Sequence, residues 1–268
     1  ERLIRNSNNI KILKNTLVTT YNFSDHLIAL EDKNVGKPQD NEKPELVLHK
    51  IRTKHTILAN GHIERFITFR NNDLPGVMLA ASFEKYLNRY GVVPDDSPVI
   101  FTNNSSTYSL LKSLTDLGHK PKAYVDIRDQ KNIEKETVEL IEKFSIPFYP
   151  KSEVEGCEGQ KEIKKVSIRT KKNQISKIKT SMLCVSGGFN PDIHLFTQSK
   201  GLLKWDKYHL TFKPDRIFQK TITLGSVSGN FSYEKLLVEV KKKLSEFEGL
   251  NELEVKFELN GPEKFQIK

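Results

Sequence analysis

Five short segments between residues 98 and 150 alternate between apolar and amphipathic runs, and this alternation restricts the fold more than any other feature of the sequence. The segments are Val99–Phe101, Ser105–Leu117, Ala123–Ile127, Asn132–Phe144 and Pro147–Tyr149. Their lengths and periodicities predict a strand, helix, strand, helix, strand order. Such a βαβαβ unit forms a parallel sheet with right-handed crossovers, and ligands bind at the carboxyl ends of its strands.

The remaining segments predict further elements on both sides of this unit. Before it, the patterns indicate strands at Ile10–Leu13, Thr16–Phe23, His26–Glu31, Glu45–Ile51 and Thr56–Ala59, then a helix over Val77–Tyr90 that ends at Gly91. After it, they indicate a hairpin within Lys161–Lys179, a strand at Met182–Val185, a helix over Pro191–Ser199, a strand at Thr221–Leu224 and a helix over Tyr233–Phe247.

The order of these elements predicts two nested domains. Strand, glycine turn and helix near the C-terminus complete a second dinucleotide-type fold, whose first strands lie before Asn60. We therefore expect an α/β protein with two nested dinucleotide-binding (Rossmann-like) domains, as in FAD/NAD(P)-linked reductases. The first domain is predicted to comprise residues 1–94 and 187–268, without its N-terminal glycine loop, and the inserted domain residues 95–186.

Composition favours a soluble globular protein. Of the 268 residues 37% are hydrophobic and 29% charged, and no segment reaches the roughly 20 apolar residues of a membrane span. No signal-like segment follows Glu1, so a cytoplasmic location is expected. Cys157, in a predicted polar loop, and Cys184, in an apolar run, match no metal-ligand spacing and are predicted to be free thiols.

The formal net charge of +9 raises the question of nucleic-acid binding. The densest basic stretch, Lys161–Lys179, has isoleucine and valine between its charges and a turn signal at Lys171–Asn173. This pattern is typical of a hairpin with lysines on its solvent face, and it lacks the aromatic residues on which bases stack. No nucleic-acid partner and no membrane partner are expected.

Five ordered stretches resemble one known family. They are Ile57–Arg65, Asn71–Leu79, Lys85–Gly91, Phe101–Asn104 and Val185–Ser199. Together they are similar to the alpha subunit of heterotetrameric sarcosine oxidase. The resemblance covers nearly the whole chain but places it inside a much longer subunit, with the first glycine-rich loop upstream and a folate-binding domain downstream.

This resemblance implies an oxidoreductase subunit that works in a complex. In the family, the beta subunit holds FAD and oxidises sarcosine, FMN lies at the interface of alpha and beta, and gamma and delta complete the heterotetramer. The alpha subunit binds NAD, and its folate domain transfers the one-carbon product to tetrahydrofolate. The chain would then serve sarcosine catabolism and one-carbon metabolism, and alone it would be inactive.

Two glycine turns form the candidate NAD site. Ala59-Asn60-Gly61 ends an apolar strand where related reductases have an Ala-Thr-Gly turn, and Gly225 to Gly229 precede the last predicted helix. Glycines there let a backbone approach a pyrophosphate. An Asn-Gly pair by itself more often marks a plain turn, and a glycine before a helix can belong to an ordinary cap. The resemblance adds four residues to the site: Val18, Ser226, Phe231 and Tyr233.

The inserted domain offers a second but weaker dinucleotide site. Asp126 ends a strand where an acid could hold a ribose, yet Thr102, Asn104 and Thr107 stand where the phosphate loop needs glycine. We therefore interpret Asp126 as a solvated strand end and assign this domain to packing or subunit contact. His62, Glu64 and Arg65 lack a nucleophile or metal pattern nearby and are interpreted as shaping the turn between domains. No catalytic and no metal-binding residue is predicted.

Two other functions share this architecture. A stand-alone NAD(P)H flavin reductase would usually need a CxxC pair or an intact glycine loop in its pyridine-nucleotide domain, and neither is present. A subunit of a related FAD/NAD-linked amino-acid or opine dehydrogenase has the same architecture, and these residues do not exclude it. A folate-binding domain encoded downstream would favour sarcosine oxidase over the dehydrogenases.

Overall fold

The computed structural model describes residues 9–35, 45–231, 236, 238–240, 242 and 243. The chain divides into unit 1, Glu1–His62 with Pro191–Lys268, and unit 2, Ile63–Asn190. Both chain ends therefore belong to unit 1. Residues 63–94 and 187–190 were predicted to belong to the domain of the chain ends, whereas the structure places them in unit 2. Val77–Leu79 pairs with Leu183–Val185 of that unit, and this pairing is the physical reason.

A five-stranded parallel sheet forms the centre of unit 2, with strand order β6-β13-β7-β8-β9. Its strands are β6 (Val77–Leu79), β7 (Val99–Thr102), β8 (Ala123–Asp126), β9 (Phe148–Pro150) and β13 (Leu183–Ser186). Every residue of β7, β8 and β13 is buried. Uninterrupted apolar runs of this kind are typical of parallel strands that are covered on both faces.

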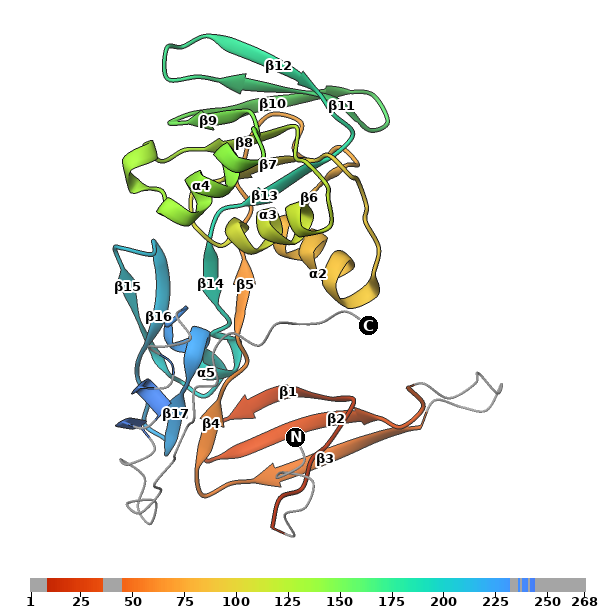
Figure 1. Cartoon of the computed structure of the whole chain (residues 1–268). Coiled ribbons are helices and arrows are strands. Elements are labelled where there is room, and N and C mark those ends of the chain that lie inside the picture. The colour runs from red at the N-terminus through yellow and green to blue at the C-terminus, as the bar shows by residue number, and fades with distance from the viewer. Residues whose placement is uncertain (1–8, 36–44, 232–235, 237, 241, 244–268) are drawn as a thin grey trace. The chain divides into compact units, whose positions relative to one another are not determined.

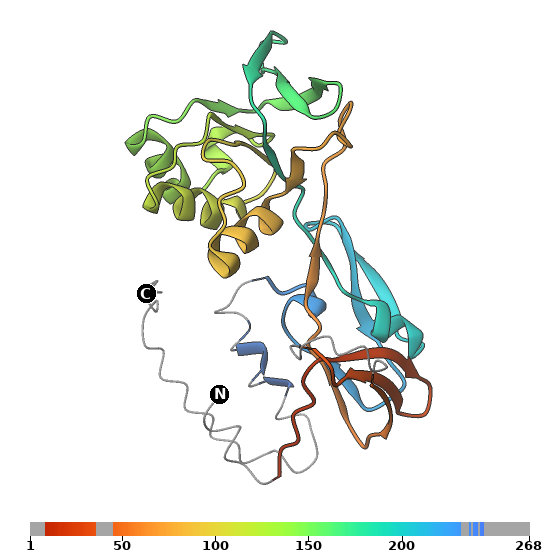
Figure 2. The same ribbon diagram turned by 90° about the vertical axis from the view of Figure 1, so that its right-hand side faces the viewer.

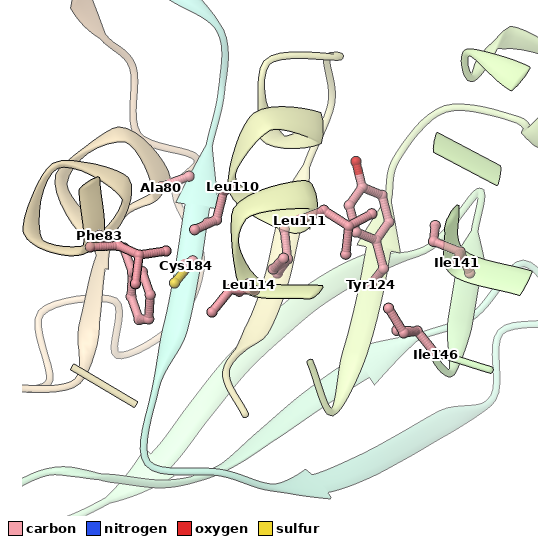
Figure 3. Packing of buried hydrophobic residues seen from close by; sticks show 11 residues of the cluster. Ala80, Phe83, Leu110, Leu111, Leu114, Tyr124, Ile141, Ile146 and Cys184 are labelled. Carbon is pink, nitrogen blue, oxygen red and sulfur yellow. The ribbon is translucent and has the colours of Figure 1, made fainter. Parts of the chain in front are cut away.

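Three helices cover one face of this sheet (Figures 1 and 2). They are α2 (Ala80–Tyr90), α3 (Thr107–Asp116) and α4 (Lys135–Lys143), and a short 3₁₀ helix, η1 (Gln130–Asn132), precedes α4. Their apolar sides meet the sheet in a core that includes Phe83, Leu114 and Tyr124 (Figure 3). The helix predicted over Val77–Tyr90 therefore begins only at Ala80, because its first three residues pair as β6.

A three-stranded antiparallel sheet covers the opposite face (Figure 1). It comprises β10 (Glu153–Gly159), β11 (Ile163–Arg169) and β12 (Ile175–Lys179). The pairing of β11 with β12 matches the lysine-rich hairpin that the sequence indicated. Cys157 is not in a polar loop, however. It pairs with Val166 inside β10 and is fully buried, and this burial raises the pKa of its thiol to about 11.

Asp126 is also not solvated as predicted. Its side chain is 0% exposed and accepts hydrogen bonds from Nε and Nη2 of Arg128 at 3.2 and 2.9 Å. The backbone N–H of Arg128 donates to the same carboxylate at 2.8 Å. Burial raises the pKa of Asp126, and these hydrogen bonds oppose the rise. The acid therefore ties β8 to the turn after it, a contact between residues two apart that periodicity does not reveal.

Unit 1 contains a meander of three antiparallel strands, as predicted. The strands are β1 (Thr16–Asn22), β2 (His26–Asp32) and β3 (Leu46–Arg52), in the order β1-β2-β3. Ile10–Leu13, predicted as a strand, has no regular structure and stands largely exposed. A small core of Tyr21, Leu27, Leu58 and Phe196 joins the meander to the rest of the unit.

Two further strand pairs complete the described part of unit 1. β4 (Thr56–Leu58) is parallel to β17 (Thr221–Thr223), and β15 (Leu202–Asp206) is antiparallel to β16 (Thr211–Arg216). A short helix, α5 (His194–Gln198), lies within the helix predicted over Pro191–Ser199. Within the part of the chain described, no helix has both the length and the apolar character needed to cross a bilayer.

The chain passes between the units at β5 (His62–Glu64) and β14 (Phe189–Pro191), which pair with each other. Glu64 accepts a hydrogen bond from the N–H of Ala81 at 2.9 Å and thereby caps α2, which has no side-chain cap of its own at its first turn. Nε of Arg65 donates to the carbonyl of Gly187 at 3.1 Å. Both contacts lie within unit 2, directly after the chain has entered it.

Acid is expected to weaken unit 1 through Asp206. Its carboxylate accepts hydrogen bonds from Lys213 Nζ at 2.6 Å and from the N–H of Tyr208 at 2.9 Å, and the bond from Lys213 is the largest cause of its lowered pKa. A carboxylate whose pKa is lower in the folded than in the unfolded state stabilises the folded state at pH values above the unfolded pKa of about 3.9. This stabilisation is lost as the pH falls further. Urea unfolding between pH 6 and 2.5 should show this loss. In the Asp206→Asn variant the free energy of unfolding should depend less on pH. An unchanged pH dependence would contradict the stabilising role of the Asp206 carboxylate.

Candidate functional site

The two predicted glycine turns follow the carboxyl ends of neighbouring parallel strands. β4 ends at Leu58 and β17 at Thr223, and the N–H of Leu224 donates to the carbonyl of Leu58 at 2.9 Å. Ala59-Asn60-Gly61 and Gly225 therefore begin at the same edge of this small sheet. Ligands of open α/β folds bind outside this edge.

Both turns use a backbone conformation that favours glycine. Gly61 has a φ of +93°, and a Cβ built there would meet no atom within 4 Å. Gly225 has a φ of +77°, and its Cβ would lie 3.4 Å from Leu236 Cδ1. Gly61 therefore leaves open space that a bound group could use. At position 225, the backbone conformation favours glycine more than the space around the residue does.

The turn after β17 is a 3₁₀ helix, η2 (Gly225–Ser228), that ends at Gly229. Ser226 is partly buried, and Val227 is fully buried. The long helix predicted over Tyr233–Phe247 lies mostly outside the described residues, of which 236, 238–240, 242 and 243 are helical. Tyr233 is also outside them.

The other predicted site residues occupy different surroundings. Val18, on β1, packs against the small core that includes Leu58. Phe231 makes edge-on ring contacts with His62 and His209, at centroid distances of 5.7 and 5.3 Å. Burial lowers the pKa of His62. Asn60 is exposed, and its Nδ2 donates to the carbonyl of Asp192 at 2.6 Å, so its side chain fixes the turn.

Glu239, Asn230 and Lys243 also reach the glycine turn, although the sequence did not indicate them. Glu239 Oε2 accepts hydrogen bonds from the N–H of Gly225 at 3.3 Å and from Asn230 Nδ2 at 3.2 Å. Lys243 Nζ donates to Glu239 Oε1 at 2.6 Å and to the carbonyl of Thr223 at 2.6 Å. Burial raises the pKa of Glu239, but the hydrogen bonds, that from Lys243 first, leave it below the usual value. The only available sequence signal was the spacing of four residues between Glu239 and Lys243, which is common on any helix.

The corresponding loop of unit 2 is filled by its own side chains. Asn104 Nδ2 donates to the carbonyl and the hydroxyl of Ser186 at 3.1 and 3.2 Å, and Ser106 Oγ lies 3.1 Å from Ser186 Oγ. Thr102 Oγ1 donates to the carbonyl of Asn104 at 3.0 Å, and Thr107 Oγ1 lies 2.7 Å from the hydroxyl of Tyr124. Side chains thus stand at the ends of β7 and β13, where a dinucleotide-binding loop has glycine.

Comparison with known sequences finds relatives of one kind. The chain is 31% identical over 227 residues to the sarcosine oxidase subunit alpha of Corynebacterium sp. (strain U-96), a match that covers 81% of this chain and 23% of that protein. It is 30% identical over 219 residues to that of Rhizobium meliloti (strain 1021), covering 78% and 20%. The chain thus spans less than a quarter of the length of these relatives. No protein-family profile matches it.

Solved structures of FAD/NAD(P)-linked oxidoreductases share the fold. Thioredoxin reductase of T. acidophilum aligns with a TM-score of 0.59 at 15% identity, covering 84% of this chain and 69% of that one. An NAD-dependent persulfide reductase of A. fulgidus aligns with a TM-score of 0.57 at 11% identity, covering 85% and 41%. The predicted α/β fold class is confirmed by these alignments and by the parallel sheet. At these identities they carry the fold alone.

Proposed function

This chain belongs to the sarcosine oxidase subunit alpha family, and we propose that it is the NAD-binding part of such a subunit. The complete complex would oxidatively demethylate sarcosine to glycine and transfer the one-carbon unit to tetrahydrofolate. The beta, gamma and delta subunits would be its partners, and FAD, FMN and the folate would bind outside this chain.

One observation carries the NAD proposal within this chain: two left-handed glycine turns follow neighbouring parallel strands at one edge of unit 1. A pyrophosphate would approach the backbone closely at Gly61, where a Cβ would meet no atom within 4 Å. It would accept a hydrogen bond from the backbone N–H of Gly225. The filled loop between Thr102 and Thr107 argues against a second site in unit 2. Ser226 lies within the second turn and Phe231 follows it, and both would border the same ligand.

The residues present would bind and orient NAD rather than react with it. NAD supplies a hydride acceptor when it is bound. Gly61 would let the backbone approach the dinucleotide, Gly225 would donate its N–H, and Phe231, already packed edge-on against His62, would offer an apolar surface. The oxidation of sarcosine would occur on the flavin-bearing partner, so the working form would be an assembly of several subunits, which we expect in the cytoplasm.

A flavin reductase with a redox-active cysteine pair is the less favoured alternative. The chain has two cysteines, and both are buried free thiols. Burial raises the pKa of Cys157 to about 11 and that of Cys184 well above its ordinary value, whereas thiol exchange requires an accessible thiolate. An amino-acid or opine dehydrogenase subunit remains the other alternative. Product analysis with sarcosine, proline and an opine as substrates of the full-length protein in its complex would distinguish a sarcosine oxidase from such a dehydrogenase.

Replacing Gly225 by valine should weaken NAD binding by at least roughly tenfold. A β-branched residue does not tolerate a φ of +77°, so the turn would shift and its N–H would leave the position that faces the ligand. Calorimetric titration of the full-length protein with NAD measures the effect. Gly118→Val is the matched control, because Gly118 also has a positive φ, of +82°, but lies in open space in unit 2. Equal losses in the two variants would move the site away from Gly225.

A further inference from the structure

Several hydrogen-bond donors converge on one carboxylate beside the glycine turn. The N–H of Gly225 and Nδ2 of Asn230 donate to Oε2 of Glu239, and Nζ of Lys243 donates to Oε1. The Glu239 side chain is only 15% exposed. A backbone N–H, an amide and an ammonium around one partly buried position are the groups that proteins use to bind anions.

Lys243 is held in place by more than this ion pair. Its Nζ also donates to the carbonyl of Thr223 at 2.6 Å and to Ser228 Oγ at 3.3 Å. These two acceptors lie at the end of β17 and within η2. The ammonium therefore stays at the carboxyl end of the strand even when its bond to Glu239 is broken.

Lys243 would attract an incoming anion, whereas the Glu239 carboxylate would oppose its binding. Its carboxylate uses the N–H of Gly225, which the proposed function assigns to a pyrophosphate oxygen, and it brings a negative charge to that position. A phosphate oxygen and a carboxylate oxygen accept the same donors, so only one of the two groups can occupy them. Binding of a phosphate therefore requires Glu239 to leave.

We propose that Gly225 N–H, Asn230 and Lys243 form a phosphate receptor that the Glu239 carboxylate fills when no nucleotide is bound. The dinucleotide displaces this internal ligand, and Lys243 becomes the cation that pairs with the phosphate. Glu239 thus sets the affinity of the site by competing with its ligand. The identity of the nucleotide as NAD rests on the proposed function, whereas the receptor itself does not.

The charge of Glu239 can be removed with almost no change in shape. Glu239→Gln keeps an amide oxygen for the N–H of Gly225 but loses the negative charge and weakens the hold of Lys243. We expect it to bind phosphate groups roughly tenfold more tightly, the lower end of what one charged hydrogen bond contributes. Lys243→Met removes the cation and should weaken binding by at least roughly tenfold.

The test uses two probes with the full-length protein. Inorganic pyrophosphate and NAD are titrated calorimetrically into the wild type, Glu239→Gln and Lys243→Met, and thermal unfolding of each variant verifies its fold. Lys54→Met is the control for charge, because Lys54 is exposed in unit 1 and precedes the amino end of β4, whereas the glycine turns follow the carboxyl ends of β4 and β17. It should bind both probes as the wild type does.

The outcomes separate the receptor from the identity of its ligand. Tighter binding of pyrophosphate by Glu239→Gln with weaker binding by Lys243→Met supports the receptor, even if NAD binds to no variant, in which case the proposed function fails alone. If NAD binds to the wild type but Glu239→Gln changes neither titration, the receptor is wrong and the proposed function stands. Absence of pyrophosphate binding in both the wild type and Glu239→Gln also overturns the receptor.

Discussion

Replacing Asp126 by alanine should lower the free energy of unfolding of unit 2 by about 3 kcal/mol, the lower end of the cost of breaking a buried ion pair. The lower end applies because the Arg128 side chain is 20% exposed and keeps bonds to Ser105 and the carbonyl of Asn132. The variant leaves the guanidinium without its main partner and the N–H of Arg128 without its acceptor. Urea unfolding followed by circular dichroism measures the loss.

Asp116→Ala is the matched control for this variant. Asp116 also pairs with a cation, Lys112, but its side chain is 60% exposed, and such pairs contribute at most about 1 kcal/mol. NAD binding should survive in the folded fraction of the Asp126 variant, because the proposed site lies in unit 1. Similar losses of stability in the two variants would show that burial of the Asp126 pair contributes little.

Gly76→Ala should destabilise unit 2 by roughly 4 kcal/mol, the sum of overpacking and backbone strain of about 1 to 3 kcal/mol each. Gly76 has a φ of +99°, and a Cβ there would overlap Ile163 Cγ2 and the backbone oxygen of Ser181. These atoms belong to or flank the strands that cover the central sheet, so they cannot withdraw without disturbing the core.

Gly91→Ala separates the two contributions. Gly91 also has a positive φ, of +65°, at the end of α2, but a Cβ there meets nothing within 4 Å. The free energy of unfolding of the Gly91→Ala variant should fall by only about 1 to 2 kcal/mol, the cost of the left-handed conformation. Chemical denaturation of both variants gives the difference. A Gly76 variant no less stable than the Gly91 variant would mean that the contact with Ser181 relaxes freely.

Local patterns in the sequence predicted those parts of the fold that depend on local periodicity. The alternation from Val99 to Tyr149 indicated the parallel unit, and the valines and isoleucines between the lysines indicated the hairpin of β11 and β12. The errors arose where a distant partner determines the structure. Val77–Leu79 continues a helical pattern and becomes a strand only because β13, a hundred residues later, pairs with it.

The sequence likewise predicted only part of the candidate site. Glycine turns after apolar strands are visible in the sequence, and the structure brings Ala59–Gly61 and Gly225 to one edge through the pairing of β4 with β17. Glu239 and Lys243 were not visible, because nothing in their spacing shows that they bond to η2. Asp126 was misread for a related reason, since only the structure shows that Arg128 turns back onto it.

The pairing of β4 with β17 also has a consequence for the order of folding. These strands are separated by all of unit 2, so they can meet only after a very long loop closes, and such contacts form slowly. Unit 2 is one uninterrupted segment, and its two ends pair as β5 and β14. Once it has folded, only residues 59–62 and 191–220 remain between β4 and β17, so the effective loop is much shorter than the full separation in sequence. Unit 2 should therefore acquire its hydrogen-exchange protection first, and the edge that carries both glycine turns should form last, after Thr221–Thr223 has left the ribosome.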